Sequence, residues 1–150
     1  MRKMTKGMKG ESNHTLDAKG RLIIPTRLRM GLGDNFVLCQ GMDHNIYAYP
    51  ESEWEAFSEK LNALPISNIT ARKFKSFFQG SAFDCEVDGQ YRIVIPQKLR
   101  TWANIDKEVV LVGNGSVAEI WDKASWEEFN SMDNMDINEI AMEVSAQYGI

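Results

Sequence analysis

The chain has 150 residues, 43% of them hydrophobic and 25% charged, with a formal net charge of −4. This balance is typical of one soluble globular domain with a real core. There is no apolar run of eighteen residues, and no apolar stretch follows the basic start, so we expect a cytoplasmic protein without a membrane segment.

The two cysteines and two histidines do not form a recognisable site. Cys39 and Cys85 make neither a C-x-x-C pair nor a cluster with His14 and His44. This pattern favours reduced, buried thiols over a metal or redox site, and it predicts no metal and no cofactor.

Charge is distributed unevenly along the chain. Residues 1–50 carry eight Lys or Arg against four Asp or Glu, residues 51–100 carry seven against seven, and residues 101–150 carry two against ten. A basic face can therefore coexist with an acidic C-terminal third, because the field on a partner depends on where charges lie. An acidic, solvated tail explains the last third equally well.

The predicted elements begin after a short basic segment. Residues 1–9 show no periodicity, which predicts a basic flexible arm. The aliphatic run 22–24 predicts a strand ended by Pro25, and residues 26–30 predict a short helix after that proline. Strands are expected over residues 36–41 and 45–49, joined by a turn.

Three longer helices are predicted. Pro50 opens one with acidic residues in its first turn. Residues 65–79 alternate basic and aromatic side chains, which favours an amphipathic connecting helix. The last one lies in the tail 131–150, where apolar residues return at helical spacing and form either core or a subunit contact.

A stretch near the start of this pattern occurs twice, at an offset of 71 residues. Asp17-Ala18-Lys19-Gly20-Arg21 precedes three aliphatic residues and Pro25, and Asp88-Gly89-Gln90-Tyr91-Arg92 precedes three aliphatic residues and Pro96. The elements that follow also recur in order. A repeat of this length, present twice, predicts two similar halves related by a pseudo-two-fold axis, over residues 10–64 and 80–130.

The repeated stretch carries the chemistry. Asp17 suits a turn because its carboxylate can accept backbone N–H groups, and Gly20 can adopt a positive φ. The turn delivers Arg21 to the start of a strand, where its guanidinium can bind Asp17, a phosphate or a guanine edge. A purely structural Asp–Arg pair and direct DNA contact are equally compatible with this pattern, and both can hold together.

Basic residues surround both turns, which predicts two basic loops that fit a DNA duplex. The candidate DNA-binding residues are Lys19, Arg21, Arg27, Arg29 and Arg92, and the candidate supporting residues of the turns are Asp17, Gly20 and Asp88. No P-loop, G-x-G-x-x-G, H-E-x-x-H or nucleophile-elbow motif occurs in the sequence, so we do not expect an enzyme.

Three groups of residues resemble the MraZ family of bacterial transcriptional regulators: Glu11 to Leu22 with Pro25, Tyr49-Pro50 with Trp54, and Glu108 to Gly113 with Glu119 to Asp122. The resemblance covers about residues 10–130. It implies an α+β fold of two pseudo-symmetric AbrB-like split β-α-β halves, with swapped-hairpin character, forming one barrel-like domain with peripheral helices. It also implies ring-like homo-oligomers that bind repeated boxes upstream of the division and cell wall gene cluster, including the protein's own promoter.

The second copy departs from the family pattern. Tyr91 stands where the family usually has Gly, so we expect a different turn there, and we expect the first loop to lead in contacting DNA. The competing hypothesis is a protein-interaction module without DNA, which would use the acidic C-terminal third and the last helix. In the leading hypothesis the protein is cytoplasmic and nucleoid-associated, with double-stranded DNA and copies of itself as partners.

Overall fold

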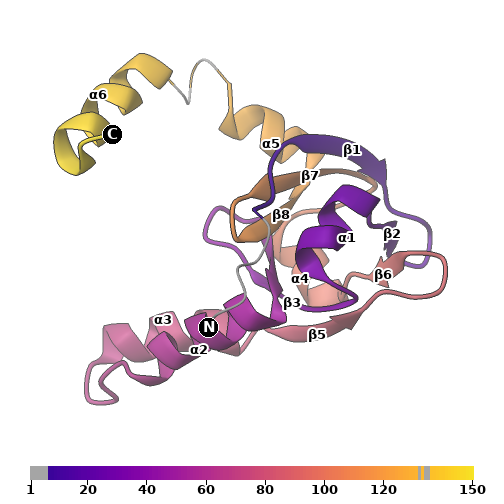
Figure 1. Cartoon of the computed structure of the whole chain (residues 1–150), viewed down its shortest axis with the longest axis horizontal. Coiled ribbons are helices and arrows are strands. Elements are labelled where there is room, and N and C mark those ends of the chain that lie inside the picture. The colour runs from indigo at the N-terminus through magenta and orange to yellow at the C-terminus, as the bar shows by residue number, and fades with distance from the viewer. Residues whose placement is uncertain (1–6, 132, 134–135) are drawn as a thin grey trace.

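The computed structural model describes residues 7–131, 133 and 136–150, and its strands form a mixed α+β fold with two antiparallel sheets (Figure 1). Within these residues, one sheet has six strands and the other is a two-stranded ribbon. The six strands lie in the order β1 (Glu11–Thr15), β7 (Glu108–Asn114), β8 (Val117–Asp122), β4 (Ile46–Pro50), β3 (Asn35–Gln40) and β5 (Phe83–Glu86). The ribbon pairs β2 (Arg21–Ile23) with β6 (Arg92–Val94).

The strands on either side of each repeated stretch pair with strands from the other copy of the repeat. β1 and β2 flank the first stretch and pair with β7 and β6. β5 and β6 flank the second stretch and pair with β3 and β2. The strands that flank each repeated stretch therefore depend on the other copy for their ladder hydrogen bonds. The two repeated stretches lie at one end of the molecule (Figure 1).

Two short helices cover the main core. α1 (Thr26–Leu32) packs on β4 and β8, and α4 (Gln97–Trp102) packs on β3. Each follows a proline, which lacks an N–H and has a φ suited to a helix start. The core between helices and sheets contains fully buried aliphatic side chains from both copies, among them Leu22, Leu28, Ile93 and Leu99.

Two helices form an arm that projects from this body (Figure 1). α2 (Glu51–Asn62) and α3 (Ile69–Gln79) pack on each other and on β3 through a separate cluster around Leu61 and Phe78. The side chain of Asn68 caps α3 by accepting the N–H of Ala71 at 3.1 Å. Aromatic rings fill this cluster, and the ring centroids of Phe57 and Phe78 are 5.1 Å apart.

The chain ends in two further helices. α5 (Lys123–Phe129) lies beside β7 and β8, whereas α6 (Ile137–Tyr148) extends away from the body (Figure 1). No residue of α6 is buried. No helix in the described part of the chain is long and apolar enough to cross a membrane.

The structure confirms the coarse α+β prediction and refines the predicted elements. The helices predicted after Pro25 and Pro50, in residues 65–79 and in the tail are all present. The strands β1 and β5 were missed. The main sheet has two edges, β1 and β5, so within the described residues its strand pairing does not close into a barrel.

The start of the chain differs from the predicted arm where the structure describes it. Met8 is buried, and its N–H and carbonyl exchange hydrogen bonds of 2.7 and 2.8 Å with Gly115. Residues 1–6 of that predicted arm lie outside the described residues.

Candidate nucleic-acid interface

The first repeated stretch forms a turn held by the carboxylate of Asp17. Its Oδ1 accepts the backbone N–H groups of Lys19 and Arg21, each at 2.9 Å, and its Oδ2 accepts the Nε–H of Arg21 at 2.6 Å. Gly20 donates its N–H to the carbonyl of Asp17 and has a φ of +74°. The turn thus fixes the inner edge of the Arg21 guanidinium and leaves its two terminal nitrogens without a hydrogen bond to any described residue.

The second stretch forms the same turn, contrary to our expectation from Tyr91. Oδ1 of Asp88 accepts the N–H groups of Gln90 and Arg92 at 2.8 and 2.9 Å, and its Oδ2 accepts the Nε–H of Arg92 at 3.0 Å. Tyr91 has a φ of +62°, the left-handed conformation that Gly20 adopts in the first turn. A tyrosine rarely adopts this conformation. The hydrogen bonds to the Asp88 carboxylate and the pairing of the ribbon therefore stabilise the turn against the conformational preference of Tyr91.

Both carboxylates remain ionised at neutral pH. The backbone N–H of Arg21 is the largest cause that lowers the pKa of Asp17 below its usual value, with further contributions from the Arg21 side chain and the Lys19 N–H. The backbone N–H of Arg92 likewise leads in lowering the pKa of Asp88. Each Asp is therefore a permanent anion that orients its arginine.

The β2–β6 ribbon joins the two turns. Arg21 lies opposite Val94, Leu22 opposite Ile93, and Ile23 opposite Arg92. The ladder continues at both ends, because Ile24 donates to the carbonyl of Tyr91 at 2.8 Å and Ile95 donates to the carbonyl of Gly20 at 2.9 Å. Side chains alternate along a strand, so Arg21 and Arg92 lie on the same outer face of the ribbon.

Arg29 and Arg100 support the turns in a crossed arrangement. The Nε–H of Arg29 donates to the carbonyl of Ile24 at 3.1 Å, and its Cζ lies 3.8 Å from the ring centroid of Tyr91. Arg100 makes the matching bond to Ile95 at 3.0 Å, and its guanidinium lies over Gly20, where an added Cβ would be 3.0 Å from Cζ. Each copy therefore supplies the arginine that covers the turn of the other.

The remaining candidates lie around this centre. Lys19 is exposed in the first turn. Arg27 is on the exposed side of α1 with its guanidinium beside Gly10, where an added Cβ would be 2.7 Å from Nη1. Burial and the charge of Arg27 lower the pKa of His14. The structure thus brings Lys19, Arg21 and Arg92 together at the turns and the ribbon. Arg29 lies over Tyr91 of the second turn, and Arg27 lies beside Gly10, just before β1.

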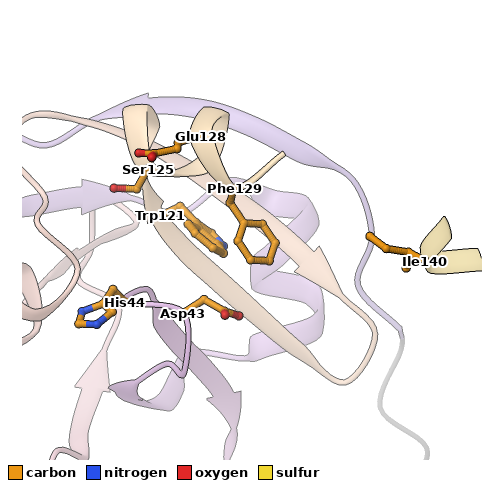
Figure 2. Close-up of a pocket in the computed structure, with 7 residues that line it drawn as sticks. All are labelled: Asp43, His44, Trp121, Ser125, Glu128, Phe129 and Ile140. Carbon is orange, nitrogen blue, oxygen red and sulfur yellow. The ribbon is translucent and has the colours of Figure 1, made fainter. Parts of the chain in front are cut away.

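A separate pocket of about 420 Å³ is lined by residues of β8 and α5 and by Asp43, His44 and Ile140 (Figure 2). Trp121 and Phe129 lie against each other in it, with their ring centroids 4.8 Å apart. The ring of His44 stacks on Trp102 instead, with the ring centroids 4.0 Å apart.

Within the described residues no group of three His, Cys, Asp or Glu side chains could hold a metal. The two cysteines are buried as free thiols, and burial raises the pKa of each to about 12.

The fold and the paired turns define a class of protein in which a two-stranded ribbon displays arginines that are oriented by carboxylates. A family model described as "MraZ protein, putative antitoxin-like" matches the chain twice, over residues 8–77 and 78–144. The chain belongs to this MraZ family, which confirms the resemblance found in the sequence.

Relatives from several bacteria carry the name "Transcriptional regulator MraZ". One from Lachnoclostridium phytofermentans is 48% identical over 141 residues, covering 94% of this chain and 96% of the relative. One from Pelotomaculum thermopropionicum is 46% identical over 135 residues, covering 90% and 93%. One from Desulforamulus reducens is 43% identical over 132 residues, covering 88% and 93%.

Sequence reasoning missed three features of the site. It did not predict that Arg100 covers the first turn or that Tyr91 has a positive φ. It also did not predict that Ile23 and Val94 lie on the outer face of the ribbon. The 71-residue offset contained the signal for all three, because it aligns Arg100 with Arg29, Tyr91 with Gly20, and Val94 with Ile23.

Proposed function

We propose that the chain is a DNA-binding transcriptional regulator, cytoplasmic and nucleoid-associated, that contacts double-stranded DNA through its two turns. The observation that carries the proposal is the pair of matching Asp–Arg units at one end of the molecule. In each unit the carboxylate accepts the Nε–H of the arginine, and the terminal nitrogens make no hydrogen bond to another described residue. The name of the relatives, "Transcriptional regulator MraZ", supports the regulatory part of the proposal.

The proposed contacts follow from the chemistry of each side chain. The terminal nitrogens of Arg21 and Arg92 can donate a fork of two hydrogen bonds to a phosphate or to the O6 and N7 of guanine. Lys19 adds a cation to the first turn, so we propose that this turn contributes more than the second. Arg27 and Arg29 are secondary phosphate contacts, because the Nε and Nη2 of Arg29 already donate to Ile24 and Thr26.

The proposal includes the arrangement of the chain as two AbrB-like halves with swapped hairpins, over residues 10–64 and 80–130. The exchange of strand partners between the two copies of the repeat supports it. Residues 65–79 would connect the halves, and residues 131–150 would be a helical tail. Two related halves suit a duplex, whose backbone also repeats.

The proposed assembly is a ring-like homo-oligomer that binds repeated boxes upstream of the division and cell wall gene cluster, including the protein's own promoter. Self-association is supported by α6, whose Ile137 and Tyr148 are 60% and 68% exposed. An apolar groove along α3, lined by Phe74, Phe77 and Trp102 among others, offers a matching surface. We propose that α6 of a second copy covers this groove, because α6 carries Glu139 and Glu143 while α3 carries basic residues.

Binding of the full-length protein to the DNA upstream of its own gene tests the function. Fluorescence anisotropy should show a higher affinity for this duplex than for a scrambled duplex of equal composition. The affinity should fall as salt rises, with a slope of about 0.9 per phosphate contacted. Equal binding of both duplexes, or a flat salt response, would contradict a specific DNA-binding regulator.

A protein-interaction module that uses the acidic C-terminal third is the second candidate. The exposed apolar side chains of α6 favour it, and they are also what self-association requires. A protein truncated after residue 130 separates the possibilities. If α6 serves assembly, light scattering should report a lower mass, and apparent DNA affinity should fall through lost multivalency while binding by each protomer persists. Truncation that leaves both properties unchanged would favour a different partner for α6.

A further inference from the structure

The outer face of the β2–β6 ribbon carries two exposed aliphatic side chains between the two arginines. Ile23 is 57% exposed and Val94 is 58% exposed, whereas their neighbours Leu22 and Ile93 are fully buried. Single exposed aliphatic residues are common on protein surfaces and need no explanation. Here, however, both copies of the repeat place a β-branched residue at the same position, two residues after the arginine.

The register arranges these four side chains as a checkerboard. Arg21 is opposite Val94, and Arg92 is opposite Ile23, so the aliphatic side chains lie on one diagonal and the guanidinium groups on the other. Diagonal neighbours in an antiparallel pair are about 7–8 Å apart. This spacing is close to two base-pair steps of a duplex, each about 3.4 Å.

We propose that Ile23 and Val94 are specificity-determining residues that contact the 5-methyl groups of thymines in the major groove. The inference rests on the proposed function, in which Arg21 and Arg92 anchor the same ribbon to the DNA. A two-stranded ribbon fits the major groove, and the thymine methyl group is the apolar feature that the base edges present there. The diagonal spacing places the contacted thymines about two base pairs apart.

The surroundings of the two side chains favour DNA over a protein as the partner. Arg21 and Arg92 flank them directly in the ladder, and Lys19 lies in the adjacent turn. The core of a protein–protein interface is depleted of charged residues, whereas a DNA interface is strongly positive. An aliphatic side chain between cations that hold the backbone is well placed to read a methyl group.

Thymine-to-deoxyuridine replacement in the upstream duplex removes the methyl groups and keeps the base pairing, so it provides the test. The full-length wild-type protein should lose about three- to fourfold in affinity for each contacted thymine that is replaced. The double variant Ile23→Ala/Val94→Ala loses both methyl contacts, so it should bind the thymine duplex more weakly by the product of the two factors, about ten- to fifteenfold, and should lose nothing further on the uracil duplex. Ile66→Ala is the matched control, because Ile66 is 78% exposed at the α2–α3 connection and should respond to uracil as the wild type does.

A second pair of variants distinguishes loss of the methyl contacts from loss of folded structure. Ile23→Val and Val94→Ile keep a β-branched side chain, and each should retain most of the sensitivity to the thymine methyl groups. The melting temperature and the mass by light scattering should match the wild type in all variants, since both side chains are exposed.

The outcomes separate this inference from the function on which it rests. A wild type that does not distinguish the upstream duplex from a scrambled one would overturn the proposed function itself. Specific binding with equal affinity for thymine and uracil duplexes would overturn only the methyl contacts. If uracil lowers the affinity of the wild type and of the double variant equally, the effect comes from DNA shape. If the double variant has a different mass by light scattering, the face is a subunit contact. Either result also overturns the inference.

Discussion

The two turns share their hydrogen bonds but differ in the side chains around them. Both have an aspartate that accepts two backbone N–H groups and the arginine Nε–H, and both have a residue with positive φ before the arginine. In the first turn this residue is Gly20, covered by Arg100, and in the second it is Tyr91, which lies under Arg29. The Asp–Arg unit therefore dictates the geometry, and the remaining residues decide how closely each turn can approach a partner.

The largest expected difference between the turns is in DNA affinity. Arg21→Ala should weaken binding by about tenfold or more, because a good forked contact is worth about 1–3 kcal/mol. Arg92→Ala should cost severalfold less, since Lys19 has no counterpart in the second turn. Anisotropy titrations with the upstream duplex measure both, and equal losses would mean that the turns contribute equally.

Asp17→Ala is the control that separates orientation from folding. It removes the acceptor of all three bonds in the first turn, whereas Arg21→Ala keeps the two backbone bonds to Asp17. Arg21→Ala should therefore melt within a few degrees of the wild type while Asp17→Ala melts lower. A large drop in melting temperature for Arg21→Ala would instead favour a purely structural ion pair.

The next comparison concerns stability and the residue with positive φ. Gly20→Ala should destabilise the protein by about 1–2 kcal/mol, because an L-residue pays that cost in the left-handed region. The new Cβ would also press on Arg100. Urea unfolding under conditions that fix the oligomeric state measures the loss.

Substitutions at Tyr91 should give a different pattern. Tyr91→Gly relieves about 1–2 kcal/mol of backbone strain but removes the contact with Arg29, which is worth about 0.5–1 kcal/mol at an exposed site, so stability should stay unchanged or rise by up to about 1.5 kcal/mol. Tyr91→Ala keeps the strain and loses the contact, so it should be the less stable of the two. If Tyr91→Gly is strongly destabilising, the ring contributes more than its contact with Arg29.

These comparisons also indicate what the sequence could predict. The offset of 71 residues located both turns and the prolines before α1 and α4, but it did not lead us to place Arg100 over the first turn. The strands β1 and β5 were missed because Glu11–Thr15 is polar throughout, and both strands form by pairing with distant strands of the other copy. The conformation of Tyr91 contradicts the preference of its residue type, and only the bonds of Asp88 and the ribbon explain it.

The smallest expected effect is the pH dependence of the two turns, and it tests whether they are equivalent. The folded-state pKa values of Asp17 and Asp88 are both lowered, so the folded protein binds fewer protons than the unfolded chain in acid. Each carboxylate therefore contributes stability above its ordinary pKa of 3.8, and this contribution disappears as the pH falls through the lower folded value. Asp17→Asn and Asp88→Asn keep an oxygen acceptor for the backbone N–H groups but carry no charge. Each should flatten the acid limb of a plot of unfolding free energy against pH, and the two should flatten it equally, because the same three donors surround each carboxylate. If only one of the two variants flattens the acid limb, the two turns hold their arginines with different strength although their geometry is the same.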